Sequence, residues 1–174
     1  MHTDMDHLDL TTLRLERVTT PTDDVRSLIR ELEDNLAAAY PPEQRHGLAI
    51  DAIFQPHIQF FIARIDGAAV GCGGVALFAD LAEVKRMYVR PAARGRGIAD
   101  ALLAQLEAVT RSAGLTRLCL ETGDQQLAAI RVYRRAGFAP CAPFGDYTAM
   151  SPASIATSVF LDKQLAPEPS PSRG

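Results

Sequence analysis

Residues 83–103 of the chain read EVKRMYVRPAARGRGIADALL. Val84, Met87, Tyr88 and Val89 form an apolar and aromatic run that Pro91 ends, which predicts a strand. From position 98 onward, apolar residues recur at helical spacing, at positions 98, 102, 103, 106 and 109, which predicts an amphipathic helix. Two glycines, at 95 and 97, lie between these elements, where the backbone has to turn sharply. The stretch therefore predicts a strand, a tight turn and a helix.

The turn has the chemistry of an anion-binding site. The first amides of a helix have no partner within the helix, and they carry partial positive charge. Because Gly95 and Gly97 lack side chains, a pyrophosphate can approach those amides, and Arg94 and Arg96 add full charges beside them. The turn lacks the Gly-Lys-Ser/Thr ending of a P-loop, and its spacing differs from that of the dinucleotide fingerprint. The alternative interpretation is an ordinary strand-to-helix turn.

Composition limits the function classes. The 174 residues are 47% hydrophobic and 22% charged, which is typical of one globular domain with a substantial core. The net charge of −3 argues against nucleic-acid binding. We expect no membrane span and no secretory signal, because no apolar run is long enough and the N-terminus is polar and acidic. Three widely spaced cysteines predict neither a disulfide framework nor a metal site, so we expect a cytoplasmic protein without a metal.

The other elements follow from hydrophobic periodicity and from the positions of glycine and proline. We expect a helix capped by Thr22 or Asp23, and a hairpin turn at Asp66-Gly67. The predicted order is β-α-α-β-β-β-α-β-α-β-β. The expected segments are a strand at 10–18, helices at 22–39 and within 43–53, strands at 60–65, 69–78 and 82–89, a helix at 97–113, a strand at 115–121, a helix at 126–136, strands from 138 and at 158–163, and a disordered Pro/Ser tail at 166–174.

Two motifs resemble one known family. Residues 94–99, RGRGIA, fit the pattern Arg/Gln-x-x-Gly-x-Gly/Ala, and residues 126–138, QLAAIRVYRRAGF, are similar to Asn-x-x-Ala-x-x-x-Tyr-x-x-x-Gly-Phe. Both patterns are typical of the GNAT superfamily of N-acetyltransferases, and Gln126 stands where that family often has Asn. The resemblance implies an α/β (α+β) fold with a mixed, mostly antiparallel central sheet flanked by helices, in a single domain over residues 1–165.

The same resemblance implies that acetyl-CoA is the co-substrate. In this family the pantetheine arm lies between two splayed strands and pairs with the central strand as an added strand does. The loop after that strand holds the pyrophosphate, and the later helix contacts the arm. The residues implied are Met87, Tyr88 and Val89 on the strand, Arg94, Gly95, Arg96, Gly97, Ile98 and Ala99 in the loop, and Gln126 and Ala129 on the helix.

The resemblance also implies two catalytic residues. An acceptor amine must lose a proton before it attacks, and Glu83 is the expected base. Strand alternation predicts that Glu83, Lys85 and Met87 share one face. The alternative is that Glu83 is a surface carboxylate or pairs with Lys85 or Arg86. Tyr133 is the expected acid for the departing thiolate, and the alternative is a core tyrosine that anchors its helix.

The expected acceptor is the primary amine of a small or amino-acid-like molecule. Protein acetylation and a non-catalytic acetyl-CoA-binding module are the alternatives. Arg45, His46, Asp146 and Tyr147 are expected near the acceptor, because loops commonly carry specificity. Members of this family often dimerise, so a homodimer is compatible with the sequence.

Overall fold

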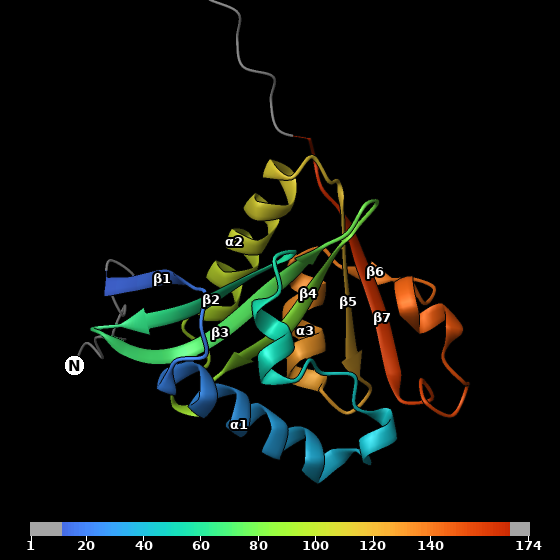
Figure 1. The fold of residues 1–174 in the computed structure, drawn as a ribbon, viewed down its shortest axis with the longest axis horizontal. Coiled ribbons are helices and arrows are strands. Elements are labelled where there is room, and N and C mark those ends of the chain that lie inside the picture. Colours follow the sequence, from blue (N-terminus) through green and yellow to red (C-terminus); the bar gives the residue numbers. More distant parts are fainter. Residues whose placement is uncertain (1–11, 168–174) are drawn as a thin grey trace, which may run out of the picture.

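The computed structural model describes residues 12–167 and contains one seven-stranded sheet (Figure 1). The strand order is β1-β2-β3-β4-β5-β7-β6, and all neighbours are antiparallel except β4 and β5. This mixed, mostly antiparallel sheet confirms the predicted fold class. The strands are β1 (Leu13–Val18), β2 (Ile58–Ile65), β3 (Ala68–Leu77), β4 (Ala82–Val89), β5 (Arg117–Gly123), β6 (Ala139–Pro140) and β7 (Ser158–Gln164).

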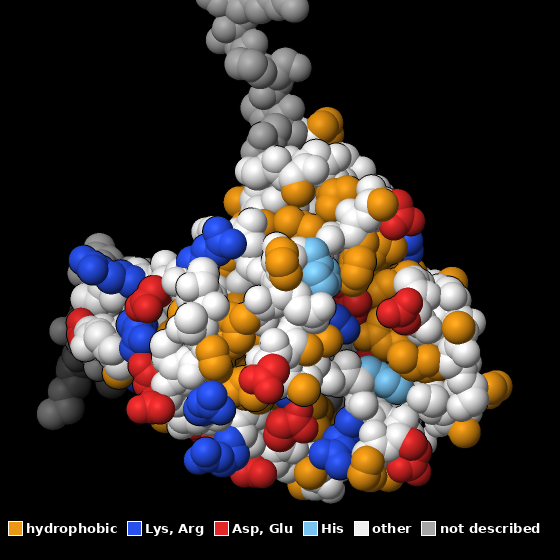
Figure 2. Space-filling model, viewed as in Figure 1, with side chains coloured by type: hydrophobic (Ala, Val, Ile, Leu, Met, Phe, Trp, Pro, Cys, Tyr) orange, Lys and Arg blue, Asp and Glu red, His pale blue; other side chains and the backbone are white. Residues whose placement is uncertain are grey.

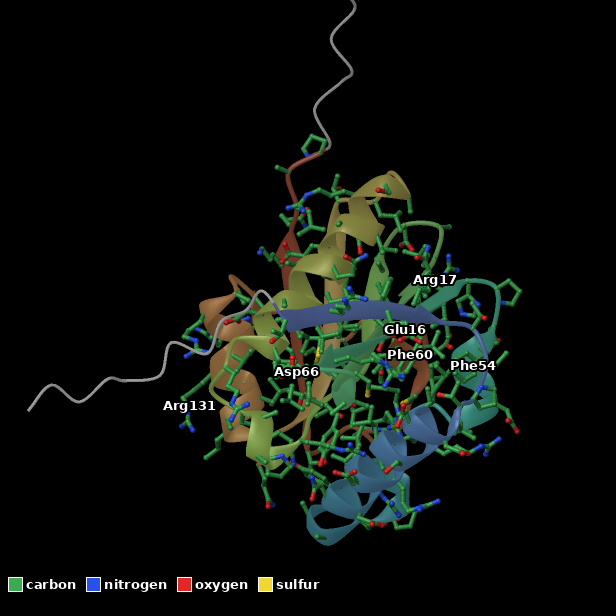
Figure 3. All side chains as sticks on the ribbon, turned by 90° about the vertical axis from the view of Figure 1, so that its left-hand side faces the viewer. Glu16, Arg17, Phe54, Phe60, Asp66 and Arg131 are labelled. Carbon is green, nitrogen blue, oxygen red and sulfur yellow. The ribbon has the colours of Figure 1, made fainter. Side chains whose placement is uncertain are left out.

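Helices cover both faces of the sheet, and each buries an apolar stripe against it (Figure 3). On one face, α1 (Asp23–Ala39) begins at the predicted cap Thr22, whose hydroxyl accepts a hydrogen bond from the Val25 amide. On the other face lie α2 (Ile98–Ser112) and α3 (Leu127–Arg135). No helix within residues 12–167 is long and apolar enough to cross a membrane.

The predicted second helix is wrong. Two short 3₁₀ turns, Pro42–Gln44 and Ile50–Phe54, stand in its place. Pro42 begins the first turn and Gly47 lies between the two turns, so neither run is long enough for a stable helix. Ile53 is the buried residue of the second turn, and the ring of the neighbouring Phe54 meets that of Phe60 edge-on with centroids 6.0 Å apart (Figure 3).

Other boundaries differ less from the expectation. The Asp66-Gly67 turn has positive φ at both residues and joins β2 to β3, as predicted. The strand expected from Phe138 is only the pair Ala139–Pro140, because proline has no amide hydrogen for a longer ladder. The predicted strand residue Leu10 and most of the expected C-terminal tail lie outside the described residues.

Strands β4 and β5 separate soon after they meet, as predicted. Their parallel pairing is confined to two residue pairs, Ala82 with Leu118 and Glu83 with Cys119. Beyond these pairs the two strands diverge toward the start of α2 and of α3 (Figure 1). The sheet is therefore open at its centre, along the edge of β4 that faces β5.

A bulge in β4 changes the direction of its side chains. The ladder with β3 pairs Cys72 with Tyr88 but Gly74 with Lys85, so β4 contains one extra residue, and Arg86 has a φ of 54°. Lys85 pairs with Glu83, whereas Met87 packs into the core beneath α2. The prediction that Met87 shares a face with Glu83 and Lys85 is therefore wrong, because the extra residue reverses the alternation.

Candidate active site

A cleft of about 640 Å³ lies where β4 and β5 diverge. Its walls are the end of β4, the loop that leads into α2, and α3. It collects every residue predicted to contact the cofactor except Arg96, which is exposed and is not among its lining residues. The predicted residues that line it are Met87, Tyr88, Val89, Arg94, Gly95, Gly97, Ile98, Ala99, Gln126 and Ala129.

The loop before α2 leaves room for an anion. Gly95 and Gly97 have φ values of +79° and +78°, and no heavy atom lies within 4 Å of the position that a Cβ would take on either residue. Gly97 is the N-cap of α2, so the uncapped amides of this helix begin directly after it. Arg94 is fixed beside them, because its Nε donates a 3.0 Å hydrogen bond to the Val89 carbonyl oxygen. The loop therefore suits a phosphate group.

A second, smaller pocket of about 120 Å³ adjoins this cleft. Met87, Ala129 and Tyr133 line both cavities, so the two cavities adjoin at these side chains. We call the smaller cavity the acceptor pocket. On the face shown in Figure 2, basic and acidic side chains lie together in a hollow bordered by hydrophobic side chains. Residues 12–167 contain no group of three or more His, Cys, Asp or Glu side chains that could hold a metal ion.

The acceptor pocket contains most of the loop residues predicted from the sequence. Arg45, His46 and Tyr147 line it, and Asp146 does not. The His46 ring lies edge-on to that of Tyr147, with centroids 5.7 Å apart, and its Nε2 is 2.9 Å from the carbonyl oxygen of Ser154. Segments far apart in the sequence thus meet around one small volume.

Tyr133 is placed between the two cavities. Its side chain is buried and meets Phe138 edge-on, so the anchoring role considered from the sequence is present. Burial raises the pKa of its phenol, and the Glu121 carboxylate raises it further. The hydroxyl is therefore protonated at neutral pH, as a general acid must be.

Glu83 is engaged by two neighbours. Its Oε2 accepts a 2.7 Å hydrogen bond from the Tyr147 hydroxyl and lies 2.8 Å from Lys85 Nζ. Lys85 Nζ is also 3.2 Å from the Tyr147 hydroxyl, which closes a three-membered cluster. The ion pair with Lys85 that the sequence left open is thus present. Glu83 is therefore held in a fixed position in the wall of the pocket.

A second carboxylate in the acceptor pocket was not singled out from the sequence. Glu121 lies on β5 and lines the pocket beside Tyr133. Burial raises the pKa of Glu121 to about 7; the Glu83 charge also raises it, while Lys85 and a hydrogen bond with Ser158 lower it. The signal that could have identified it is its place near the carboxyl end of the strand parallel to β4, where ligands bind in open sheets.

Comparison with known proteins defines the family. Residues 25–138 match the acetyltransferase (GNAT) family. The chain belongs to this family. A relative from Azospirillum brasilense named IAA acetyltransferase is 43% identical over 145 residues, which cover 82% of this chain and 92% of the relative. The family predicted from the two motifs is confirmed, and the protein is an acetyl-CoA-dependent N-acetyltransferase by class.

Solved structures of this GNAT enzyme's relatives agree. A candidate acyl-CoA N-acyltransferase from Klebsiella pneumoniae superposes with a TM-score of 0.69 at 31% identity, over 88% of this chain and 98% of the other. The PaiA N-acetyltransferase from Thermoplasma acidophilum, solved in complex with coenzyme A, has a TM-score of 0.66 at 17% identity, over 87% and 98% of the two chains. At 17% identity, the similarity to the PaiA enzyme shows a shared fold alone.

Proposed function

We propose that this GNAT enzyme transfers an acetyl group from acetyl-CoA to the primary amine of a small, amino-acid-like acceptor, by direct attack within a ternary complex. One observation carries the proposal: a cleft suited to a phosphorylated arm meets a small polar pocket at Tyr133. The acceptor pocket, at about 120 Å³, is far below the volume of typical ligand sites, which favours a compact acceptor.

The cofactor side is assigned to the residues that line the cleft. The open edge of β4 near Met87 and Val89 offers backbone groups to the pantetheine amides, as an added strand would use them. Gly95 and Gly97 allow the pyrophosphate to approach the first amides of α2. Gln126 lines the cleft from α3, where its longer amide offers the arm the hydrogen bonds of the usual asparagine.

Acetyl-CoA supplies a thioester whose carbonyl carbon is attacked by the acceptor nitrogen. Glu121 accepts the proton that the ammonium group must lose, directly or through a water molecule. Tyr133 donates its phenolic proton to the sulfur as the carbon–sulfur bond breaks. Glu83 is the competing candidate for the base, and in this mechanism it orients Lys85 and Tyr147 in the wall of the pocket.

The acceptor class rests on the pocket and not on a relative's name. The Azospirillum relative is named for IAA, indole-acetic acid, and its name supports acetyl transfer. Indole-acetic acid contains a carboxylate and an indole nitrogen but no amine, so it does not suit direct N-acetylation. A compact amine that fits the acceptor pocket is chemically consistent with Glu121 and Tyr133.

The proposal is tested by a thiol-release assay with acetyl-CoA and a panel of amino acids, polyamines, aminoglycosides and a lysine peptide, with calorimetry of acetyl-CoA binding alongside. We expect turnover with the amino acids and micromolar-range or tighter binding of acetyl-CoA. Turnover with the peptide alone would indicate a protein acetyltransferase. Binding without turnover of any amine would indicate a sensing module and contradict the proposal.

The phosphate loop has its own test, Gly97→Ala. An alanine at a φ of +78° destabilises the fold by about 1–2 kcal/mol, and its methyl group enters the space that the pyrophosphate requires. We expect the Kd for acetyl-CoA to rise by roughly tenfold or more in calorimetry, as for a lost charge-assisted hydrogen bond.

Gly114→Ala is the matched control for that test. Gly114 ends α2 with the same φ of +78° and the same open space where a Cβ would stand, and it does not line the cleft. We expect the same loss of stability without a change in the Kd for acetyl-CoA. Equal effects of the two substitutions on the Kd would contradict the assignment of the loop.

A further inference from the structure

Positive charge exceeds negative charge on one wall of the acceptor pocket. Arg45, Lys85 and Arg86 all line it. The Lys85 charge is balanced by Glu83 at 2.8 Å. The two arginines share a single carboxylate, because Glu33 pairs with Arg86 through one oxygen and lies 3.8 Å from Arg45 Nη1 through the other. Within residues 12–167 no other carboxylate pairs with either guanidinium, so one of the two charges is left without a counterion.

Arg86 is buried and held in place by its surroundings. Its side chain is only 3% exposed, and the bulge in β4 places it on the α1 side of the sheet, next to Glu33. The backbone of Gly47 lies against the guanidinium, where a Cβ would collide with it. A long side chain held between Glu33 and Gly47 is a preorganised donor, which loses little entropy when it binds a ligand.

The two arginines also have unused donors. Within residues 12–167, the Nε atoms of Arg45 and Arg86 are the buried side-chain polar atoms that have no hydrogen-bond partner. A buried N–H without a partner costs free energy, so each such group needs an explanation, and a bound ligand is one. The planar fork of a guanidinium matches the two oxygens of a carboxylate.

We propose that Arg45 and Arg86 bind a carboxylate of the acceptor itself. The inference rests on the proposed N-acetyltransferase function and narrows its substrate to amino carboxylates, with α-amino acids as the simplest class. The carboxylate lies on the arginine wall, and the amine lies on the opposite side, toward Glu121 and Tyr133. The acceptor carboxylate then neutralises the charge that Glu33 leaves unbalanced.

The volume of the pocket agrees with this assignment. About 120 Å³ corresponds to roughly four water molecules at their liquid volume, which is enough for the amino and carboxyl groups on one carbon. A polyamine or an aminoglycoside brings only positive charge to the two arginines. The N-terminus of a protein has no carboxylate beside its amine. Each of these acceptors leaves the arginine wall unpaired.

The test compares each of several L-amino acids with its own α-amide, in which only the carboxylate is changed. We expect kcat/KM to favour the acid by roughly tenfold to a hundredfold, as for a lost hydrogen bond to a charged group. The amine of an amino amide is less basic and loses its proton more readily. This difference favours the amide, so it acts against the preference that we expect for the acid. Arg45→Gln and Arg86→Lys should each narrow this ratio, mainly through the KM for the acid.

Arg30→Gln is the matched control, since Arg30 is exposed on α1 and does not line either cavity. It should keep the wild-type ratio. Arg45→Gln keeps the test decisive if Arg86→Lys does not fold, which the thermal midpoint shows. Equal turnover of acids and amides by the wild type overturns the inference and leaves N-acetyl transfer standing, and so does an acid preference that survives Arg45→Gln. The absence of turnover with every amine overturns the proposed function and the inference together.

Discussion

Replacing Tyr133 with phenylalanine is expected to lower kcat by about a hundredfold or more, the range of general acid catalysis, without a change in the Kd for acetyl-CoA. The phenol lies where the cofactor cleft meets the acceptor pocket and is protonated at neutral pH, so it holds a proton next to the departing thiolate. Phenylalanine keeps the ring contact with Phe138, so the fold should persist. Steady-state kinetics and calorimetry on both proteins measure the two quantities.

Tyr147→Phe is the control for this result, since it removes a second phenol from the acceptor pocket. The Tyr147 hydroxyl bonds to Glu83 and Lys85 and lines only the acceptor pocket. We expect its loss to raise the KM of the acceptor more than the KM of acetyl-CoA. An unchanged kcat in Tyr133→Phe would remove Tyr133 as the acid and leave it the role of a helix anchor.

Replacing Glu121 with glutamine is expected to lower kcat/KM by about a hundredfold above pH 7 and to remove the acidic limb of the pH–rate profile. Burial raises the pKa of this carboxylate to about 7, and a base is active only when it has lost its proton. The wild-type rate should therefore rise as the pH increases through about 7 and level off above it. The variant lacks a titrating group and should show a flat, low profile over that range.

Glu83→Gln separates the two candidate bases. The Glu83 charge contributes to the raised pKa of Glu121, so its removal should lower that pKa. If Glu121 is the base, the acidic limb persists in Glu83→Gln and moves to lower pH. If Glu83 is the base, the limb disappears in Glu83→Gln and remains in Glu121→Gln. Profiles of kcat/KM from about pH 5 to 9 distinguish these outcomes.

Local sequence patterns predicted much of the fold. The Thr22 cap, the Asp66-Gly67 hairpin and the strand–turn–helix around Gly97 are all set by residues close in sequence. The bulge at Arg86 was not predicted, because nothing in the composition of the strand marks an extra residue. The bulge depends on the register with β3 and on the ion pair between Arg86 and Glu33, which are both tertiary contacts. The missing second helix has a local cause, because Pro42 and Gly47 break the segment into two short turns.

The cofactor cleft and the acceptor pocket also differ in how well the sequence predicted their residues. The phosphate loop is continuous in sequence, so all of its predicted residues except Arg96 line the cofactor cleft. The acceptor pocket joins α1, the 44–47 loop, two strands, α3 and residue 147, which only the tertiary structure brings together. Glu121 was missed for this reason. Its raised pKa depends on burial and on Glu83, which lies 38 positions earlier in the chain.

The short pairing between β4 and β5 has a consequence for how the protein opens. Only two residue pairs join the ladder of strands β1–β4 to that of strands β5–β7, so the two blocks share few backbone hydrogen bonds and are held together by the core. Blocks of this kind open as separate cooperative units, with amide hydrogens that exchange at different rates. A pantetheine arm that pairs along β4 would lie between the two blocks and add contacts that hold them together. We expect acetyl-CoA to slow hydrogen exchange on both sides at once and to merge the two units into one, so that the enzyme completes its architecture only when it holds its substrate.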